Sequence, residues 1–96
     1  MNEFILSPAA RQDLFDIWED IARDSLDNAD RSRDQIEDAM QRLAASPGIG
    51  HLREDLADET LRFWPVHRYL IIYRAEPRPI EIVRCLSGYR DIRSLL

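Results

Sequence analysis

The chain has 96 residues, a formal net charge of −5 and an apolar fraction of 45%. This length and composition predict one folded domain, residues 1–96, and are not those of a disordered protein. No apolar run is long enough to span a membrane, and the first residues lack the pattern of a signal peptide, so we expect a cytoplasmic protein. An acidic chain is also a poor general binder of nucleic acid, because affinity for phosphate backbones depends on the cations presented.

Charge is distributed unevenly along the chain, which contains arginine but no lysine. Residues 11–38 carry ten acids and four arginines, whereas residues 61–96 carry seven arginines and three acids. A local basic surface in the second half is therefore compatible with the acidic total. Cys85 lies among apolar residues, so we expect a buried, unreactive thiol. The single cysteine and the two histidines are too far apart in the sequence to match the spacing of metal ligands. We therefore expect neither a metal nor a cofactor.

Two amphipathic helices are predicted after a short β-prone piece at residues 3–6. Ser7-Pro8 is a strong helix start, which places the first helix at about 8–24. Ser25 or Asp27 can cap a second helix over about 26–45, and the short connection predicts an antiparallel helical hairpin. The two apolar stripes are Ala10, Leu14, Ile17, Trp18 and Ile21, then Ala29, Ile36, Ala39, Met40 and Leu43. The acids off the first stripe, interpreted as a solvated face, are Asp13, Asp16, Glu19 and Asp20.

The second half of the chain predicts strands. Residues 51–60 are interpreted as a loop or one helical turn, followed by strands over 61–66, 67–74 and 80–86. The two prolines in the cluster 75–79 mark a hairpin loop, since proline removes a ladder donor. The last strand carries apolar residues at odd and at even positions, which face opposite sides of a sheet. The sheet should therefore be covered on one face and partly on the other. The predicted fold class is α+β with the order β-α-α-β-β-β, an antiparallel sheet packed against an N-terminal helical hairpin.

The residues alone identify no reaction. There is no glycine-rich phosphate loop, nucleophile elbow or cysteine–histidine pair. The order and spacing of several short pieces nevertheless resemble the ParE toxins of the RelE/ParE superfamily over nearly the whole chain. The pieces in the first half are Leu6-Ser7-Pro8-Ala9-Ala10, Asp13-Leu14, Ile17-Trp18, Ile36-Glu37, Leu43-Ala44 and Pro47-Gly48. Those in the second half are Gly50, Arg53, Leu56, Leu61-Arg62, Tyr69–Arg74, Ile80–Arg84 and Gly88–Ile92.

The resemblance implies the toxin of a type II toxin–antitoxin module. Such a toxin is held inactive by a ParD-like antitoxin, which has a ribbon-helix-helix DNA-binding part and a tail that wraps the toxin. Operator DNA would be contacted only through the antitoxin, and no membrane partner is implied. ParE-type toxins inhibit DNA gyrase, whereas RelE-type relatives cut mRNA in the ribosome. Ser87 stands where ParE-like sequences commonly have histidine, which leaves a non-toxic regulatory member as a further alternative.

The choice between these branches has a physical basis. A ribonuclease needs cations and a general acid or base around the scissile phosphate. This chain has no lysine, and apolar residues 70–72 fill the middle of a predicted strand. We therefore expect a non-enzymatic gyrase inhibitor. The alternative, a ribosome-dependent mRNA endonuclease, would draw its catalytic groups from Arg84, Tyr89 and Arg90.

Two sets of residues are candidate interaction sites. The candidate partners for acids of an antitoxin tail are Arg62, Arg68 and Arg74, each of which could equally be solvated or paired internally. The candidate toxicity surface is the basic segment 84–93, with Arg84, Tyr89, Arg90 and Arg93. Its alternative interpretation is structural: Ile92, Leu95 and Leu96 would dock the tail on the sheet, and Arg90 would pair with Asp91 or a helix acid.

Overall fold

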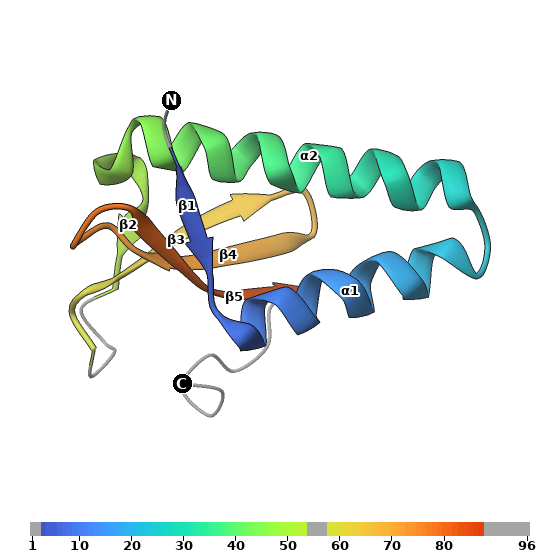
Figure 1. Cartoon of the computed structure of the whole chain (residues 1–96), viewed down its shortest axis with the longest axis horizontal. Coiled ribbons are helices and arrows are strands. Elements are labelled where there is room, and N and C mark those ends of the chain that lie inside the picture. Colours follow the sequence, from blue (N-terminus) through green and yellow to red (C-terminus); the bar gives the residue numbers. More distant parts are fainter. Residues whose placement is uncertain (1–2, 54–57, 88–96) are drawn as a thin grey trace.

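The computed structural model describes residues 3–53 and 58–87, and these ranges form an α+β fold (Figure 1). A strand comes first, two helices follow, and the remaining strands complete the sheet, as predicted. The elements are β1 (Phe4–Leu6), α1 (Pro8–Ala22), α2 (Leu26–Ala45), a 3₁₀ turn (Pro47–Ile49), β2 (His51–Leu52), β3 (Leu61–Val66), β4 (Tyr69–Arg74) and β5 (Ile80–Ser87).

Side-chain caps start both helices. The Ser7 hydroxyl accepts a hydrogen bond from the Ala10 amide at 3.0 Å, and Pro8 occupies the first turn of α1. In α2 the cap is Ser25 rather than Asp27, because the Ser25 hydroxyl accepts from the Asn28 amide at 3.1 Å. These bonds satisfy amides that have no partner within the helix. The bounds of α2 agree with the prediction, and α1 ends two residues earlier than expected.

The sheet is mixed rather than wholly antiparallel. Its strand order is β1-β5-β4-β3-β2, and β1 pairs with β5 in parallel, with Ile5 opposite Glu81. The other described pairs are antiparallel, as predicted. The sequence pattern missed the parallel pair because periodicity predicts a strand but not its neighbour. It also missed β2, where His51 and Leu52 pair with Phe63 and Arg62 in what was expected to be a loop.

The turn between β3 and β4 is tighter than predicted. Val66 pairs with Tyr69, so His67 and Arg68 form a two-residue hairpin turn instead of beginning the strand. His67 has a φ of 55°, a left-handed conformation that such turns require and that glycine or asparagine usually supplies. With His67-Arg68 in place of glycine or asparagine, no turn could be predicted at this position.

Both faces of the sheet are buried. The inner face packs against the helical hairpin, and its cluster combines residues of α1 and α2 with Ile71, Tyr73, Ile80, Ile82 and Cys85. The outer face carries a second, separate cluster, formed by Leu61, Phe63, Ile72 and Leu86 with Leu70 and Val83 packed against it. Alternation along β4 explains the division, since Ile71 and Ile72 point to opposite faces and both are 0% exposed.

A tyrosine joins the inner face to the turn that follows α2. The Tyr73 hydroxyl donates to the Pro47 carbonyl at 2.7 Å and accepts from the Gly50 amide at 2.9 Å. A Cβ atom at Gly50 would overlap the Tyr73 ring. Burial is the main cause that raises the pKa of Tyr73. The buried phenol therefore satisfies two backbone groups and requires glycine at position 50.

Candidate protein-docking surface

Arg84 is bound to helix α1. Its Nε and Nη2 atoms donate to the two carboxylate oxygens of Asp13 at 2.7 and 2.9 Å. The Cys85 amide donates to the same carboxylate at 3.0 Å. The side chains of Arg84 and Asp13 are 25% and 13% exposed, and the hydrogen bonds that Arg84 donates to Asp13 raise the pKa of Arg84. Asp13 thus holds α1 against β5. The Arg84 guanidinium, a candidate for a catalytic or toxic role, is already paired with this carboxylate.

The expectation that Asp13 belongs to a solvated face is wrong. On a helix, position 13 lies beside Ala10, Leu14 and Ile17, at the edge of the apolar stripe rather than opposite it. This signal was present in the sequence, but periodicity cannot identify a partner on a strand 71 positions away. Burial also raises the pKa of the neighbouring Cys85 thiol to about 12, with the Asp13 charge as a second cause, and the thiol is buried as predicted.

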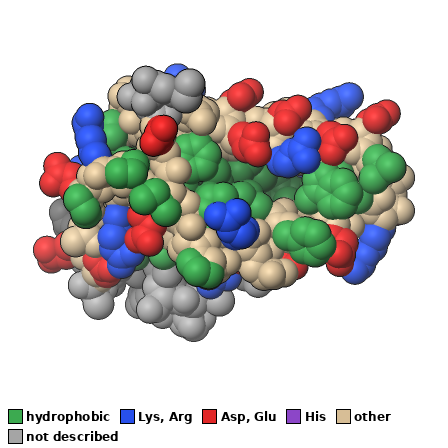
Figure 2. Space-filling view, viewed as in Figure 1, with side chains coloured by type: hydrophobic (Ala, Val, Ile, Leu, Met, Phe, Trp, Pro, Cys, Tyr) green, Lys and Arg blue, Asp and Glu red, His purple; other side chains and the backbone are tan. Residues whose placement is uncertain are grey.

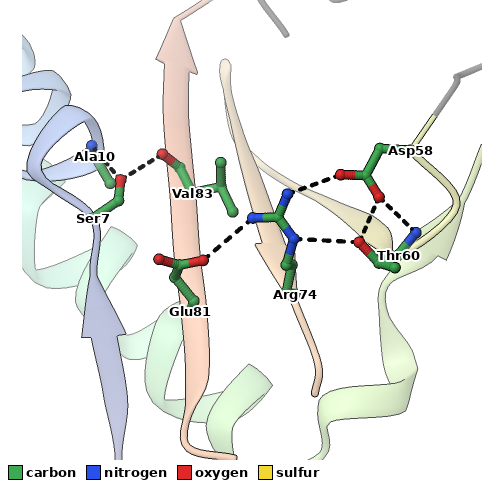
Figure 3. Close-up of polar contacts among 7 residues, drawn as sticks. All are labelled: Ser7, Ala10, Asp58, Thr60, Arg74, Glu81 and Val83. Carbon is green, nitrogen blue, oxygen red and sulfur yellow. Dashed lines mark hydrogen bonds and ion pairs between the residues drawn. The ribbon is translucent and has the colours of Figure 1, made fainter. Parts of the chain in front are cut away.

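Arg74 lies within an internal polar network at one end of the outer face (Figure 3). Its guanidinium donates to Asp58 at 2.8 Å, to Glu81 at 3.2 Å and to the Thr60 hydroxyl at 3.2 Å. Asp58 also accepts from the Thr60 amide at 2.9 Å. The hydrogen bonds from Thr60, followed by those from Arg74, lower the pKa of Asp58. The network ties β4 to β5 and to the residues that lead into β3.

Arg62 also has internal partners. Its Nη1 donates to the carbonyl oxygens of Gly48 and Gly50 at 3.2 and 3.0 Å. These bonds fasten the turn after α2 to β3. Of the three arginines expected to meet an antitoxin, Arg62 and Arg74 are therefore engaged within the chain. Arg68 is exposed and has no hydrogen bond or ion pair with another described residue.

Two clefts flank the turn that carries Arg68. The first cleft lies between α1 and the ends of β4 and β5 and has a volume of about 920 Å³. Its lining residues are Asp16, Ile17, Glu19, Asp20, Ile21, Arg23, Arg68, Tyr69 and Ser87. The second cleft, of about 450 Å³, lies between α2 and β3 with its turn. Its lining residues are Gln35, Asp38, Ala39, Arg42, Trp64, Pro65, Val66 and His67.

The clefts and the turn form one surface between the helices, here called the turn surface. In the view of Figure 2, hydrophobic side chains gather in the hollow between α1 and α2, and charged side chains border it. The helical hairpin extends past the strands in the same view of the ribbon (Figure 1). An apolar floor with charged rims is the arrangement that accepts an amphipathic peptide. Sequence reasoning identified Arg68 but not the clefts, which require α1, α2 and the turn to be placed together.

The remaining candidates lie at or beyond the end of β5. Ser87 is exposed, ends the strand and lines the first cleft. Tyr89, Arg90 and Arg93 lie outside the described residues. Within the described ranges, no group of three or more histidines, cysteines or acids is placed to hold a metal ion. Nor is any helix of these ranges long and apolar enough to cross a membrane.

Comparison with known proteins gives a consistent result. The family model described as ParE toxin of the type II toxin–antitoxin system parDE matches residues 4–92. Among solved structures, the chain is similar to one titled as the chromosomal ParDE toxin–antitoxin system from P. aeruginosa, with a TM-score of 0.75 and 16% identity. The alignment covers 93% of this chain and 98% of that one. No match was found among curated proteins.

Proposed function

Because the chain belongs to the ParE toxin family, we propose that it is the toxin of a type II module, is neutralised in the cytoplasm by a ParD-like antitoxin and inhibits DNA gyrase. The family match over residues 4–92 carries this proposal. The likeness in fold to a ParDE structure agrees with it. The antitoxin and the gyrase target each have their own supporting contacts and their own test.

The turn surface is the proposed site for the antitoxin. Its apolar floor suits anchors on the wrapping segment, and Arg68 offers a cation that has no internal partner in the described chain. Arg62 and Arg74 are less suitable contacts, because their guanidinium groups already satisfy carbonyl or carboxylate oxygens of this chain. An acid of the antitoxin would pair with Arg68 without displacing an existing bond.

Binding of the neighbouring gene's product tests the antitoxin site. We expect Arg68→Glu to weaken the complex at least about tenfold, which corresponds to about 1.4 kcal/mol. Arg78→Glu is the matched control, since Arg78 is also exposed but lies in the loop between β4 and β5. Dissociation constants measured by titration calorimetry give the comparison. Equal weakening by both variants, or none by Arg68→Glu, would remove Arg68 from the interface.

The contacts on the sheet favour a gyrase inhibitor over a ribonuclease. In the middle of β4, Leu70 and Ile72 occupy the outer face and Ile71 the inner one, so no cation of this stretch can stabilise a scissile phosphate. Arg84, the described member of the alternative nuclease set, is bidentate with Asp13. Using Arg84 on RNA would require breaking this half-buried pair, which is costly.

Expression of the chain without its antitoxin tests the target. For a gyrase inhibitor we expect broken DNA and filamented cells, with transcripts largely intact. A ribosome-dependent nuclease would instead stop translation and leave transcripts cut at codons. Transcript cleavage that disappears in Tyr89→Phe would replace our proposal with the nuclease. Absence of any growth defect would favour a regulatory member and direct attention to Ser87.

A further inference from the structure

The two-residue turn between β3 and β4 has an unfavourable backbone conformation at its first residue. Among the residues other than glycine in the described ranges, only His67 has a positive φ, at 55°. Arg68, the second residue of the turn, does not share it. A hairpin turn with a positive φ at its first central residue alone is of type II′, which usually has glycine there. The chain thus holds a histidine where glycine would carry less strain.

In the described chain, no polar or ring contact of the histidine side chain offsets this strain. His67 is exposed, and its imidazole makes no hydrogen bond, ion pair or ring contact with another described residue. His51 differs, because its ring stacks on Trp64 with the ring centroids 5.9 Å apart. Strained residues that persist in a fold cluster at binding sites and other functional positions. The benefit of a histidine at this turn is therefore expected from contact with a partner.

The turn lies beside α2 (Figure 1), and His67 lines the second cleft between them. Polar side chains line the same cleft from the helix and are here called the α2 row: Gln35, Asp38 and Arg42. Their spacing, i, i+3 and i+7, places them on one face of α2. All three are exposed, and none of their side chains has a hydrogen bond or ion pair with another described residue. The apolar wall of the cleft is formed by Trp64, Pro65 and Val66.

The first cleft offers fewer unpaired polar groups. There Arg23 pairs with Glu19 and Asp20 at 3.9 and 3.7 Å. Asp16 likewise accepts a hydrogen bond from Gln12 at 2.8 Å. The second cleft instead combines an unpaired acid, guanidinium, amide and imidazole with an apolar wall. Such groups discriminate between partners, because a segment without matching groups leaves them desolvated and unsatisfied. The second cleft is thus the part of the turn surface better suited to selecting a partner.

We propose that His67 determines specificity for the antitoxin, through a contact between its imidazole and the antitoxin segment that fills the second cleft. The inference rests on the proposed function and names the residues of the turn surface that select the partner. Arg68 adjoins His67, so a segment that crosses the turn meets both residues. The matching segment carries an apolar side chain for the wall at Trp64 and polar groups for the α2 row. One of these polar groups forms a hydrogen bond with a ring nitrogen of His67.

Substitutions at position 67 separate recognition from folding. Glycine adopts a positive φ without the steric cost of a Cβ atom, and asparagine tolerates the left-handed region. Both keep the turn and remove the imidazole. The experiment measures the urea midpoint of the full chain and, by titration calorimetry, its affinity for the neighbouring gene's product. The chains compared are the native one, His67→Gly, His67→Asn and the control Arg78→Ala, whose side chain is also exposed but lies in the loop between β4 and β5.

We expect His67→Gly and His67→Asn to keep or raise the urea midpoint and to weaken antitoxin binding at least about fivefold. Arg78→Ala should change neither quantity. A further pair of chains, Arg68→Ala with and without His67→Asn, separates contact from positioning. If the imidazole contacts the antitoxin, His67→Asn weakens binding by a similar factor whether Arg68 is present or not. A loss that vanishes once Arg68 is alanine would mean that His67 only positions Arg68, and would overturn the proposal.

Failure of this inference differs from failure of the proposed function. Native affinity in both His67 variants, while Arg68→Ala weakens the complex, overturns the inference and leaves the proposed function standing. Absence of binding by the native chain overturns both. If one His67 variant loses stability, the other decides. A lower urea midpoint in both variants would show that the histidine stabilises the turn itself, and this result also overturns the proposal.

Discussion

The inner face of the sheet packs against two helices, whereas the outer face carries a smaller apolar cluster with a charged network at one end. The inner contacts come from α1 and α2, whose stripes supply Ala10, Ile36, Met40 and Leu43. The outer cluster comes from the strands themselves. The comparison shows why β4 and β5 carry apolar residues on both sides of the sheet. A sheet buried on both faces needs large apolar residues on both sides of its strands, even where, in the described residues, the helices cover one face.

Neighbouring isoleucines give the sharpest test of this comparison and the largest expected effect. Ile71 and Ile72 are adjacent on β4, face opposite sides and are both 0% exposed. We expect Ile71→Ala and Ile72→Ala each to lower the free energy of unfolding by roughly 4 kcal/mol, since each removes three buried carbons and leaves a cavity. Urea denaturation measures both. A cost at Ile72 far below that at Ile71 would mean that the outer face is loosely packed.

The clamp between α1 and β5 should have the next largest effect. Asp13→Ala leaves the Arg84 guanidinium and the Cys85 amide without their acceptor. We expect a loss of about 3 kcal/mol, because removing one partner of a poorly exposed ion pair leaves an uncompensated charge. Asp16→Ala is the control, as Asp16 is exposed on the same helix. The comparison of the two faces would change if Asp13→Ala were harmless, since the helical layer would then be held by apolar contacts alone.

How much of this could be predicted from the sequence depends on the range of the interaction. Both caps, the bounds of α2 and the three main strands follow from local signals such as Ser7-Pro8 and apolar periodicity. The parallel pairing of β1 and the Asp13–Arg84 clamp depend on residues more than 70 positions apart, and no local pattern encodes such partners. The clefts around Arg68 escaped prediction for the same reason, because three separate elements line them.

Glycine at position 50 should matter more than glycine at position 48. A Cβ atom at Gly50 would overlap the Tyr73 ring, whereas one at Gly48 meets nothing within 4 Å. We expect Gly50→Ala to cost about 2 kcal/mol, as is usual for overpacking, and Gly48→Ala to change the free energy of unfolding little. Thermal unfolding monitored by circular dichroism measures the pair. Similar melting temperatures for both variants would show that Tyr73 can move aside, and that the inner face is less rigid than its contacts indicate.

The smallest effect concerns the charged network beside the outer cluster. Hydrogen bonds from Thr60, followed by Arg74, lower the pKa of Asp58 below the ordinary value of 3.8. The charged form is thus favoured by folding, so its contribution is present above pH 3.8 and is lost as pH falls through the lower pKa of the folded state. We expect the native chain to lose stability more steeply than Asp58→Asn between pH 5 and pH 2, with the exposed Glu59→Gln as the control.

Because the bonds from Thr60 outweigh the charge of Arg74, most of this difference should persist in 1 M salt, a concentration at which attraction between exposed charges is largely screened. Urea titrations at each pH, with and without salt, measure the slopes, and a difference that disappears in salt would assign the effect to Arg74 instead.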